Sequence, residues 1–137
     1  MTLVLDASLT LASIMRDENT EAAQAAMLRV AHGGACVPSL WRLEVANVLR
    51  NAIRRGRCDV AFADRALEDL DALAITVDAQ TDMQAWSATL ALSREEDLTL
   101  YDAAYLELAL RLDATLLSSD KALVAAATRR GLEVVTT

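Results

Sequence analysis

Four carboxylates stand at positions in this chain where they could act together on a metal ion. Asp6 ends the aliphatic run LVLD, and Asp120 follows the run TLLSS. Glu44 lies early in the segment LWRLEVANVLRNAIRRG, and Asp102 lies near the start of LTLYDAAYLELAL. Carboxylate oxygens are the ligands that Mg²⁺ and Mn²⁺ prefer in proteins. The chemistry that such a set predicts is metal-assisted hydrolysis.

Asp102 lies on an unexpected side of its helix. With a turn of about 100° per residue, Asp102 lines up with Leu106 and Ala109, on the apolar side. Glu107 and Arg111 point the other way, and we expect them to form the solvated face. A carboxylate on an apolar face needs a partner, and a bound cation is one that fits.

Each acid also has a purely structural interpretation. Asp6 and Asp120 have the positions of helix N-caps, and Asp102 could complete a capping box with Thr99. Glu44 shares a helix face with other polar residues, which could simply be solvated. However, neither Glu44 nor Asp102 has a basic residue one turn away. Several unpaired carboxylates at one edge repel each other strongly, and a divalent cation relieves that repulsion.

The elements that must position these acids alternate between short aliphatic strands and amphipathic helices. We expect strands at 2–6, 35–40, 74–78, 114–119 and 132–135. We expect helices at 7–15, 19–34, 40–56, 59–73, 81–96, from about 98 to 112, and 120–131. Ser39 and Asp59 are the expected N-caps of the helices that follow them.

This alternation predicts an α/β fold, a three-layer α/β/α sandwich around a parallel sheet of four to five short strands. The length of 137 residues fits a single domain spanning 1–137. Right-handed crossovers place the carboxyl ends of the strands along one edge, where sites of such sheets form. The acids that follow strands are therefore expected to meet at that edge.

Composition excludes several classes of function. The net charge of −7 argues against a fold that simply coats nucleic acid. No apolar run is long enough to span a membrane, and no signal peptide is recognisable, so we expect a cytoplasmic protein. His32 is the only histidine, and Cys36 and Cys58 are isolated thiols expected to stay reduced. Catalysis through histidine is therefore not expected.

The segments LVLDAS, SLWRLEVANVL, LTLYDAAYLELA and LLSSDKAL together resemble the PIN domain, and more narrowly the VapC-type ribonucleases of bacterial toxin–antitoxin pairs. The resemblance extends over essentially the whole chain. It implies an acidic quartet that holds Mg²⁺ or Mn²⁺, formed by Asp6, Glu44, Asp102 and Asp120. The family often has a hydroxyl near the last acid, and Ser118 or Ser119 would serve. Supporting polar residues would be Ser8, Ser119 and Thr99.

The expected activity is a metal-dependent endoribonuclease in which a metal-activated water attacks the RNA phosphodiester bond. Arg50, Arg54 and Arg55 could contact the RNA backbone, which could be transfer RNA or another structured RNA, or could be only a solvated helix end. The alternative is a PIN-like module with vestigial catalysis that only binds partners. Haloacid-dehalogenase phosphatases are excluded because Ser8 stands where they need an aspartate.

The resemblance to VapC toxins also implies two protein partners. One is a small VapB-like antitoxin, whose arginine could pair with the acidic quartet. The second is another copy of the chain in a homodimer. Apolar residues of the first helix and of the helix containing Glu44 could receive the antitoxin or could pack in the domain's own core; these are Leu11, Ile14, Met15 and Leu49.

Overall fold

The computed structural model describes all 137 residues and contains five strands and eight helices. The strands are β1 (Leu3–Leu5), β2 (Ala35–Val37), β3 (Ile75–Val77), β4 (Thr115–Leu117) and β5 (Val134–Val135). The helices are α1 (Ala7–Ile14), α2 (Glu21–Gly33), α3 (Trp41–Arg54), α4 (Val60–Asp71), α5 (Thr81–Gln84), α6 (Ala88–Glu96), α7 (Leu100–Leu112) and α8 (Lys121–Arg129). All five predicted strands are present.

The strands form one parallel sheet in the order β3-β2-β1-β4-β5. From β1 the chain steps to β2 and β3 on one side, then crosses β1 to add β4 and β5 on the other. The direction of winding therefore reverses between β1 and β4, whose residues pair as Leu3 with Thr115 and Leu5 with Leu117. Ligands of open parallel sheets bind at such a reversal, outside the carboxyl ends of the strands.

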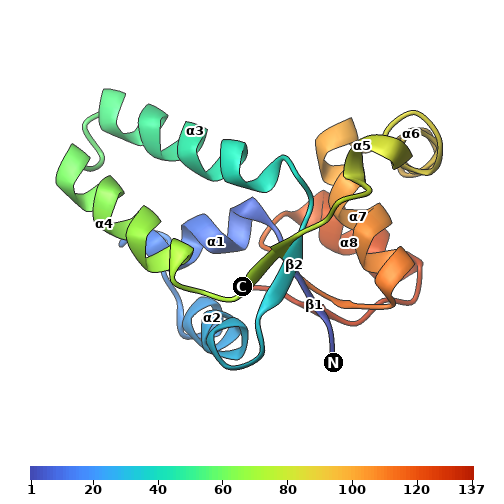
Figure 1. Cartoon of the computed structure of the whole chain (residues 1–137), viewed down its shortest axis with the longest axis horizontal. Coiled ribbons are helices and arrows are strands. Elements are labelled where there is room, and N and C mark those ends of the chain that lie inside the picture. The colour runs from blue at the N-terminus through green and yellow to red at the C-terminus, as the bar shows by residue number, and fades with distance from the viewer.

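Helices cover both faces of the sheet, which confirms the predicted three-layer α/β/α architecture. The first four helices, α1 to α4, pack together on one face, and α5 to α8 pack on the other (Figure 1). The central strands β1 and β4 are buried along their whole length because helices lie above and below them. This explains why their sequences are continuous aliphatic runs without alternation.

The expectation that Glu107 and Arg111 form a solvated face of α7 is wrong. Glu107 is buried, and Arg111 is half-buried between it and Asp78, which follows β3. The Arg111 guanidinium donates to both oxygens of Asp78, at 3.1 and 2.7 Å, and to both oxygens of Glu107. The helix is covered on nearly all sides because α6 packs along it, so its charged residues pair with each other and with the sheet edge.

We expect Arg111→Ala to lower the free energy of unfolding by about 3 kcal/mol, because it leaves two largely buried carboxylates unpaired. Arg42→Ala is the matched control. Arg42 pairs with Asp71 at 3.1 Å, but both side chains are more than half exposed, so the loss should stay below about 1 kcal/mol. Urea denaturation measures both. Equal losses would mean that the ion pairs of Arg111 with Asp78 and Glu107 contribute no more to stability than an exposed ion pair does.

Two further expectations about local structure are wrong. Ser39 does not cap α3; Leu40 has the N-cap position, and the Ser39 hydroxyl donates instead to Asp82 of α5 at 3.3 Å. The single helix expected over 81–96 is two helices, α5 and α6. Ser87 has non-helical dihedral angles, φ −118° and ψ −100°, and interrupts the helix between them. The predicted cap Asp59 is confirmed, since its carboxylate accepts the N–H of Phe62.

The apolar residues considered for the antitoxin lie mostly in the core. Leu11, Met15 and Leu49 are buried, and Ile14 is half-buried against the same core. Their burial follows from the packing of α1 against α2 and α3, so Leu11, Met15 and Leu49 offer no free surface, and only Ile14 stays partly exposed. None of the eight helices has the length and hydropathy of a membrane-spanning segment.

Candidate active site

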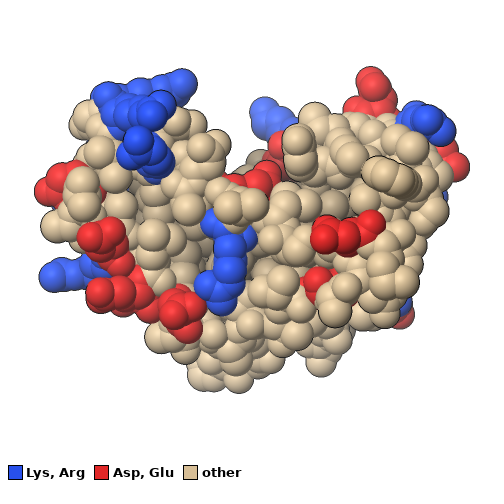
Figure 2. All heavy atoms as spheres, turned by 45° about the horizontal axis from the view of Figure 1, so that its top comes forward, with Lys and Arg blue, Asp and Glu red and all other residues tan.

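The fold brings the four acids to the same edge from four different elements. Asp6 directly follows β1, and Asp120 lies three residues after β4, so both lie where the winding of the sheet reverses. Glu44 is in the first turn of α3, on one side of the sheet, and Asp102 is in the first turn of α7, on the other. Figure 2 shows a notch between the two helical lobes, with acidic side chains inside it.

Asp6 is the most enclosed of the four acids, with 3% of its surface exposed. One oxygen, Oδ1, accepts the N–H of Leu9 at 2.9 Å and so caps α1. The other, Oδ2, accepts the Ser118 hydroxyl at 2.5 Å, and the Ser8 hydroxyl donates to the carboxylate at 2.7 Å. Asp6 is therefore a helix cap, as one interpretation of the sequence proposed, and also the buried centre of a cluster of hydroxyls.

The serine beside Asp6 is Ser118 rather than Ser119. The Ser118 hydroxyl is buried, donates to Asp6 and accepts the N–H of Asp120 at 3.0 Å, so it links two of the acids. Ser119 contributes its backbone N–H to the Ser8 hydroxyl, and its own hydroxyl contacts Thr137 at the surface.

Glu44 is held by a residue that the sequence pattern did not single out. The hydroxyl of Tyr105, on α7, donates to Oε1 of Glu44 at 2.5 Å. Tyr105 lies one turn after Asp102, on a helix whose middle is buried on every side. A tyrosine in the buried middle of a helix is a signal for such a contact, because a buried hydroxyl requires a partner.

The charge of Asp102 acts on both Asp6 and Glu44. Burial raises the pKa of the Asp6 carboxyl to about 6, and the charge of Asp102 adds to the rise. Burial also raises the pKa of Glu44, again with a contribution from Asp102. The pKa of Asp102 is itself raised by burial and by the charge of Asp120. A neighbouring negative charge makes a carboxylate take up a proton more readily. Raised pKa values are therefore the expected behaviour of an acidic cluster without a cation.

Asp120 and Thr99 also act as helix caps. The carboxylate of Asp120 accepts the N–H of Leu123 at 2.9 Å at the start of α8. The Thr99 hydroxyl accepts the N–H of Asp102 at 3.1 Å at the start of α7. These bonds fix the backbone at both acids, because a cap sets the direction in which the helix begins.

The chemistry of the four acids fits a hard divalent cation. None of them takes part in any ion pair of the structure, although arginines pair with acids elsewhere. No three acidic, histidine or cysteine side chains approach closely enough to form a ready-made metal cage. Mg²⁺ does not need such a cage, since it usually keeps several waters and binds one or two carboxylates. The donor atoms and the uncompensated negative charge therefore suit Mg²⁺ or Mn²⁺.

Residues 3–136, nearly the whole chain, match the family model of the PIN domain. The chain belongs to the PIN domain family. It is 32% identical to ribonuclease VapC3 of Mycobacterium tuberculosis over 124 residues, in each of two strains, which covers 90% of this chain and 86% of the relative. The resemblance to VapC-type PIN domains, inferred from the sequence, is confirmed.

Solved structures agree with the PIN fold. The crystal structure of PAE2754 from Pyrobaculum aerophilum superposes with a TM-score of 0.72 at 26% identity, covering 98% of this chain and 91% of that one. VapBC2 from Rickettsia felis, bound to a DNA fragment from its promoter, gives a TM-score of 0.67 at 14% identity. That match covers 100% of this chain and 99% of the other, so the fold is shared over its full length.

Basic residues of this PIN domain lie at the far end of the helix that carries Glu44. Arg50, Arg54 and Arg55 are exposed and take part in no ion pair, whereas Arg57 pairs with Asp17 and Glu18. Figure 2 shows basic side chains gathered over this end of α3. The helix therefore runs from a negative site at its start to a positive surface at its end.

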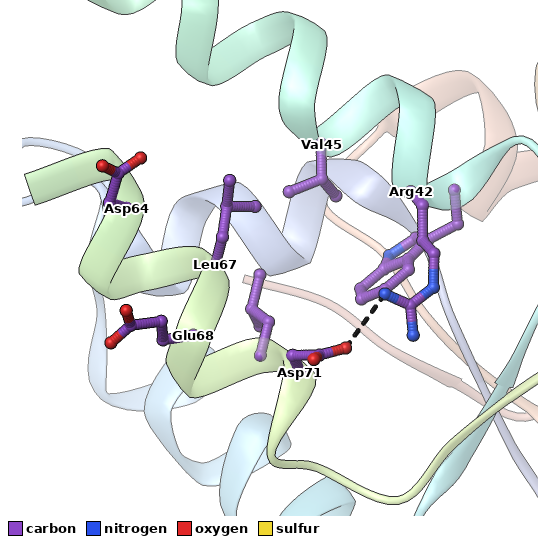
Figure 3. A pocket seen from close by; sticks show the side chains of 8 residues that line it. Arg42, Val45, Asp64, Leu67, Glu68 and Asp71 are labelled. Atoms are coloured by element: carbon purple, nitrogen blue, oxygen red, sulfur yellow. Dashed lines mark hydrogen bonds and ion pairs between the residues drawn. The ribbon is translucent and has the colours of Figure 1, made fainter. Parts of the chain in front are cut away.

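A second hollow of the PIN domain, between α3 and α4, lacks the properties of the acidic edge. Its lining includes Val45 and Leu67, and Arg42 reaches across it to pair with Asp71 (Figure 3). Asp64 and Glu68 of α4 also line it and are exposed to solvent. None of these acids follows a strand, and Asp71 is already paired with Arg42.

Proposed function

We propose that this PIN domain is a Mg²⁺- or Mn²⁺-dependent endoribonuclease, the toxin of a toxin–antitoxin pair. The main support is the cluster of four carboxylates without a basic partner at the point where the winding of the sheet reverses. The relationship to ribonuclease VapC3 supports RNA as the substrate, because the chain covers most of that relative.

Each residue of the proposed site has a role that follows from its surroundings. Asp6, Asp102 and Asp120 would hold the ion together with Glu44, and the caps on α1, α7 and α8 keep three of these acids in place. Ser8 and Ser118 orient the carboxylate of Asp6. When bound, the ion supplies an activated water and stabilises negative charge on the phosphate. Arg50, Arg54 and Arg55 would contact the RNA backbone.

Metal dependence is the test of this proposal. We expect total RNA and transfer RNA to be cut in the presence of Mg²⁺ or Mn²⁺, and cutting to stop with a chelator and return when metal is restored. The Asp6→Asn variant should remain inactive under all these conditions. Because water is the nucleophile, the products should carry 5′-phosphate and 3′-hydroxyl ends, which end-specific ligation and phosphatase treatment identify.

Three outcomes would contradict the proposal in different ways. Undiminished cleavage in chelator would show that the acids act without metal. Absence of cleavage with every RNA and metal would favour the alternative function, a partner-binding module with vestigial catalysis. A 2′,3′-cyclic phosphate end would mean that the ribose hydroxyl, and not water, attacks the phosphate.

A small VapB-like antitoxin is part of the proposed function, with the chain acting in the cytoplasm as a homodimer. The acidic edge has no basic partner within the chain, so an arginine from an antitoxin could pair with it bidentately and exclude both metal and RNA. Because Leu11, Met15 and Leu49 are buried, an antitoxin would have to bind other surfaces.

Co-expression tests this partner. We expect the chain to arrest growth when expressed alone, and the neighbouring reading frame to restore growth and to co-purify with it. The Asp6→Asn variant should be harmless but should still bind the neighbour, which separates binding from toxicity. Normal growth with the wild-type chain alone, together with no binding of the neighbour, would contradict the toxin assignment.

A further inference from the structure

Tyr105 connects the two helical layers inside the acidic site. Its ring is in α7 on one side of the sheet, and its hydroxyl reaches Glu44 of α3 on the other. The side chain is almost completely buried, with 1% of its surface exposed. The hydroxyl donates to Oε1 of Glu44, while Oε2 accepts no hydrogen bond in the structure.

Glu44 needs such a contact because its surroundings repel it. It is half-buried, has no basic residue in contact, and feels the negative charge of Asp102. Without a donor, a glutamate on the first turn of an exposed helix would turn toward water. Asp6 is fixed by Leu9, Ser8 and Ser118, whereas the hydroxyl of Tyr105 is the one hydrogen-bond donor to Glu44.

The tyrosine hydroxyl suits this position because it stays neutral and protonated. A buried phenol that donates a hydrogen bond to a carboxylate brings no charge of its own. A lysine or arginine at the same place would neutralise the site and compete with a divalent cation. A phenol holds the carboxylate without cancelling its charge.

We propose that Tyr105 is a positioning residue, whose hydroxyl holds Oε1 of Glu44 inside the acidic site and leaves Oε2 and the negative charge available to a divalent cation. The inference rests on the proposed metal-dependent function and extends it to the residue that organises the fourth acid. Tyr105 does not touch substrate in this role. It acts through Glu44.

The test measures Mn²⁺ binding directly, by calorimetric titration of the purified full chain without RNA. We expect Tyr105→Phe to bind Mn²⁺ roughly tenfold more weakly than the wild type, since one hydrogen bond to a charged group is lost. Tyr101→Phe is the matched control, because Tyr101 is on the same helix but 63% exposed and without a hydrogen bond from its hydroxyl. It should bind Mn²⁺ like the wild type.

A double-mutant cycle shows whether Tyr105 acts through Glu44. Glu44→Ala should itself weaken Mn²⁺ binding, and adding Tyr105→Phe to it should have no further effect, because alanine leaves the tyrosine hydroxyl no oxygen to hold. Thermal melting of each variant checks the fold. If Tyr105→Phe melts earlier but binds Mn²⁺ like the wild type, the hydroxyl is only a structural link and the inference is wrong. If the wild type itself binds no Mn²⁺, the proposed function fails and the inference fails with it.

Discussion

Asp102→Asn should reduce RNA cleavage by more than about 100-fold while leaving the metal-free protein folded and slightly more stable. The loss is large because Asp102 is one of the four proposed metal ligands and lies close enough to Asp6 and Glu44 for its charge to raise the pKa of both. Removing one negative charge lowers the repulsion in the cluster, so the melting temperature should rise. Single-turnover cleavage and thermal melting measure the two effects.

Asp113→Asn is the matched control for this variant. Asp113 ends the same helix and has a left-handed backbone, φ 48°, which asparagine also tolerates well. The substitution is chemically identical but lies at the opposite end of α7 from the acidic edge, so cleavage should be unchanged. If Asp102→Asn cleaves RNA as well as Asp113→Asn does, Asp102 is a structural residue at a helix start and not part of the site.

Asp6→Asn should stabilise the metal-free protein at neutral pH by up to about 3 kcal/mol. The native pKa of Asp6 is about 6 against 3.8 for an unperturbed aspartate, mainly because of burial. The native state therefore binds more protons than the unfolded state between these two values, and wild-type stability falls as pH rises through that window. Above about pH 6 the buried carboxylate is ionised, and burial of its charge lowers the free energy of unfolding by the full amount. Each unit of difference between the native and the unfolded pKa corresponds to about 1.4 kcal/mol.

The pH dependence distinguishes this effect from a general improvement in packing. The stability difference between Asp6→Asn and the wild type should be largest near neutral pH and should disappear below about pH 4, as urea denaturation at several pH values would show. Asparagine remains a good N-cap for α1. Asp59→Asn, which changes the same kind of cap on α4, should give little change. A difference independent of pH would contradict the assigned cause.

Much of the fold was predictable because strand and cap signals are local. Short aliphatic runs bounded by polar residues, Gly or Pro defined every strand, and their alternation with helices defined a parallel sheet. The caps Asp6, Asp59 and Asp120 are recognisable for the same reason, since each bonds to an N–H three residues later. The edge on which the acids lie follows from topology alone.

The errors concern contacts between segments distant in sequence. Helical periodicity placed Glu107 and Arg111 in water, but α6 and Asp78 cover them, and neither is visible from α7 alone. Serine is a common helix cap, but the hydroxyl of Ser39 donates to Asp82 of α5 instead. The bond between Tyr105 and Glu44 joins residues 61 positions apart, so no local pattern reports it. Pairings of this kind depend on how layers pack, and a single sequence does not specify them.

The pairing of β1 with β4 has a consequence for synthesis of the chain. Asp6 is translated well before its partner Ser118, which lies 112 positions later, and Asp120 follows later still. Folding of an emerging polypeptide proceeds from its N-terminus, so β2 can join β1 long before β4 exists. Until then the Asp6 carboxylate has Ser8 beside it but lacks both the Ser118 donor and the neighbouring Asp120. The acidic edge is thus assembled only after Ser118 and Asp120 have been translated, and a translation product that ends before β4 does not contain it.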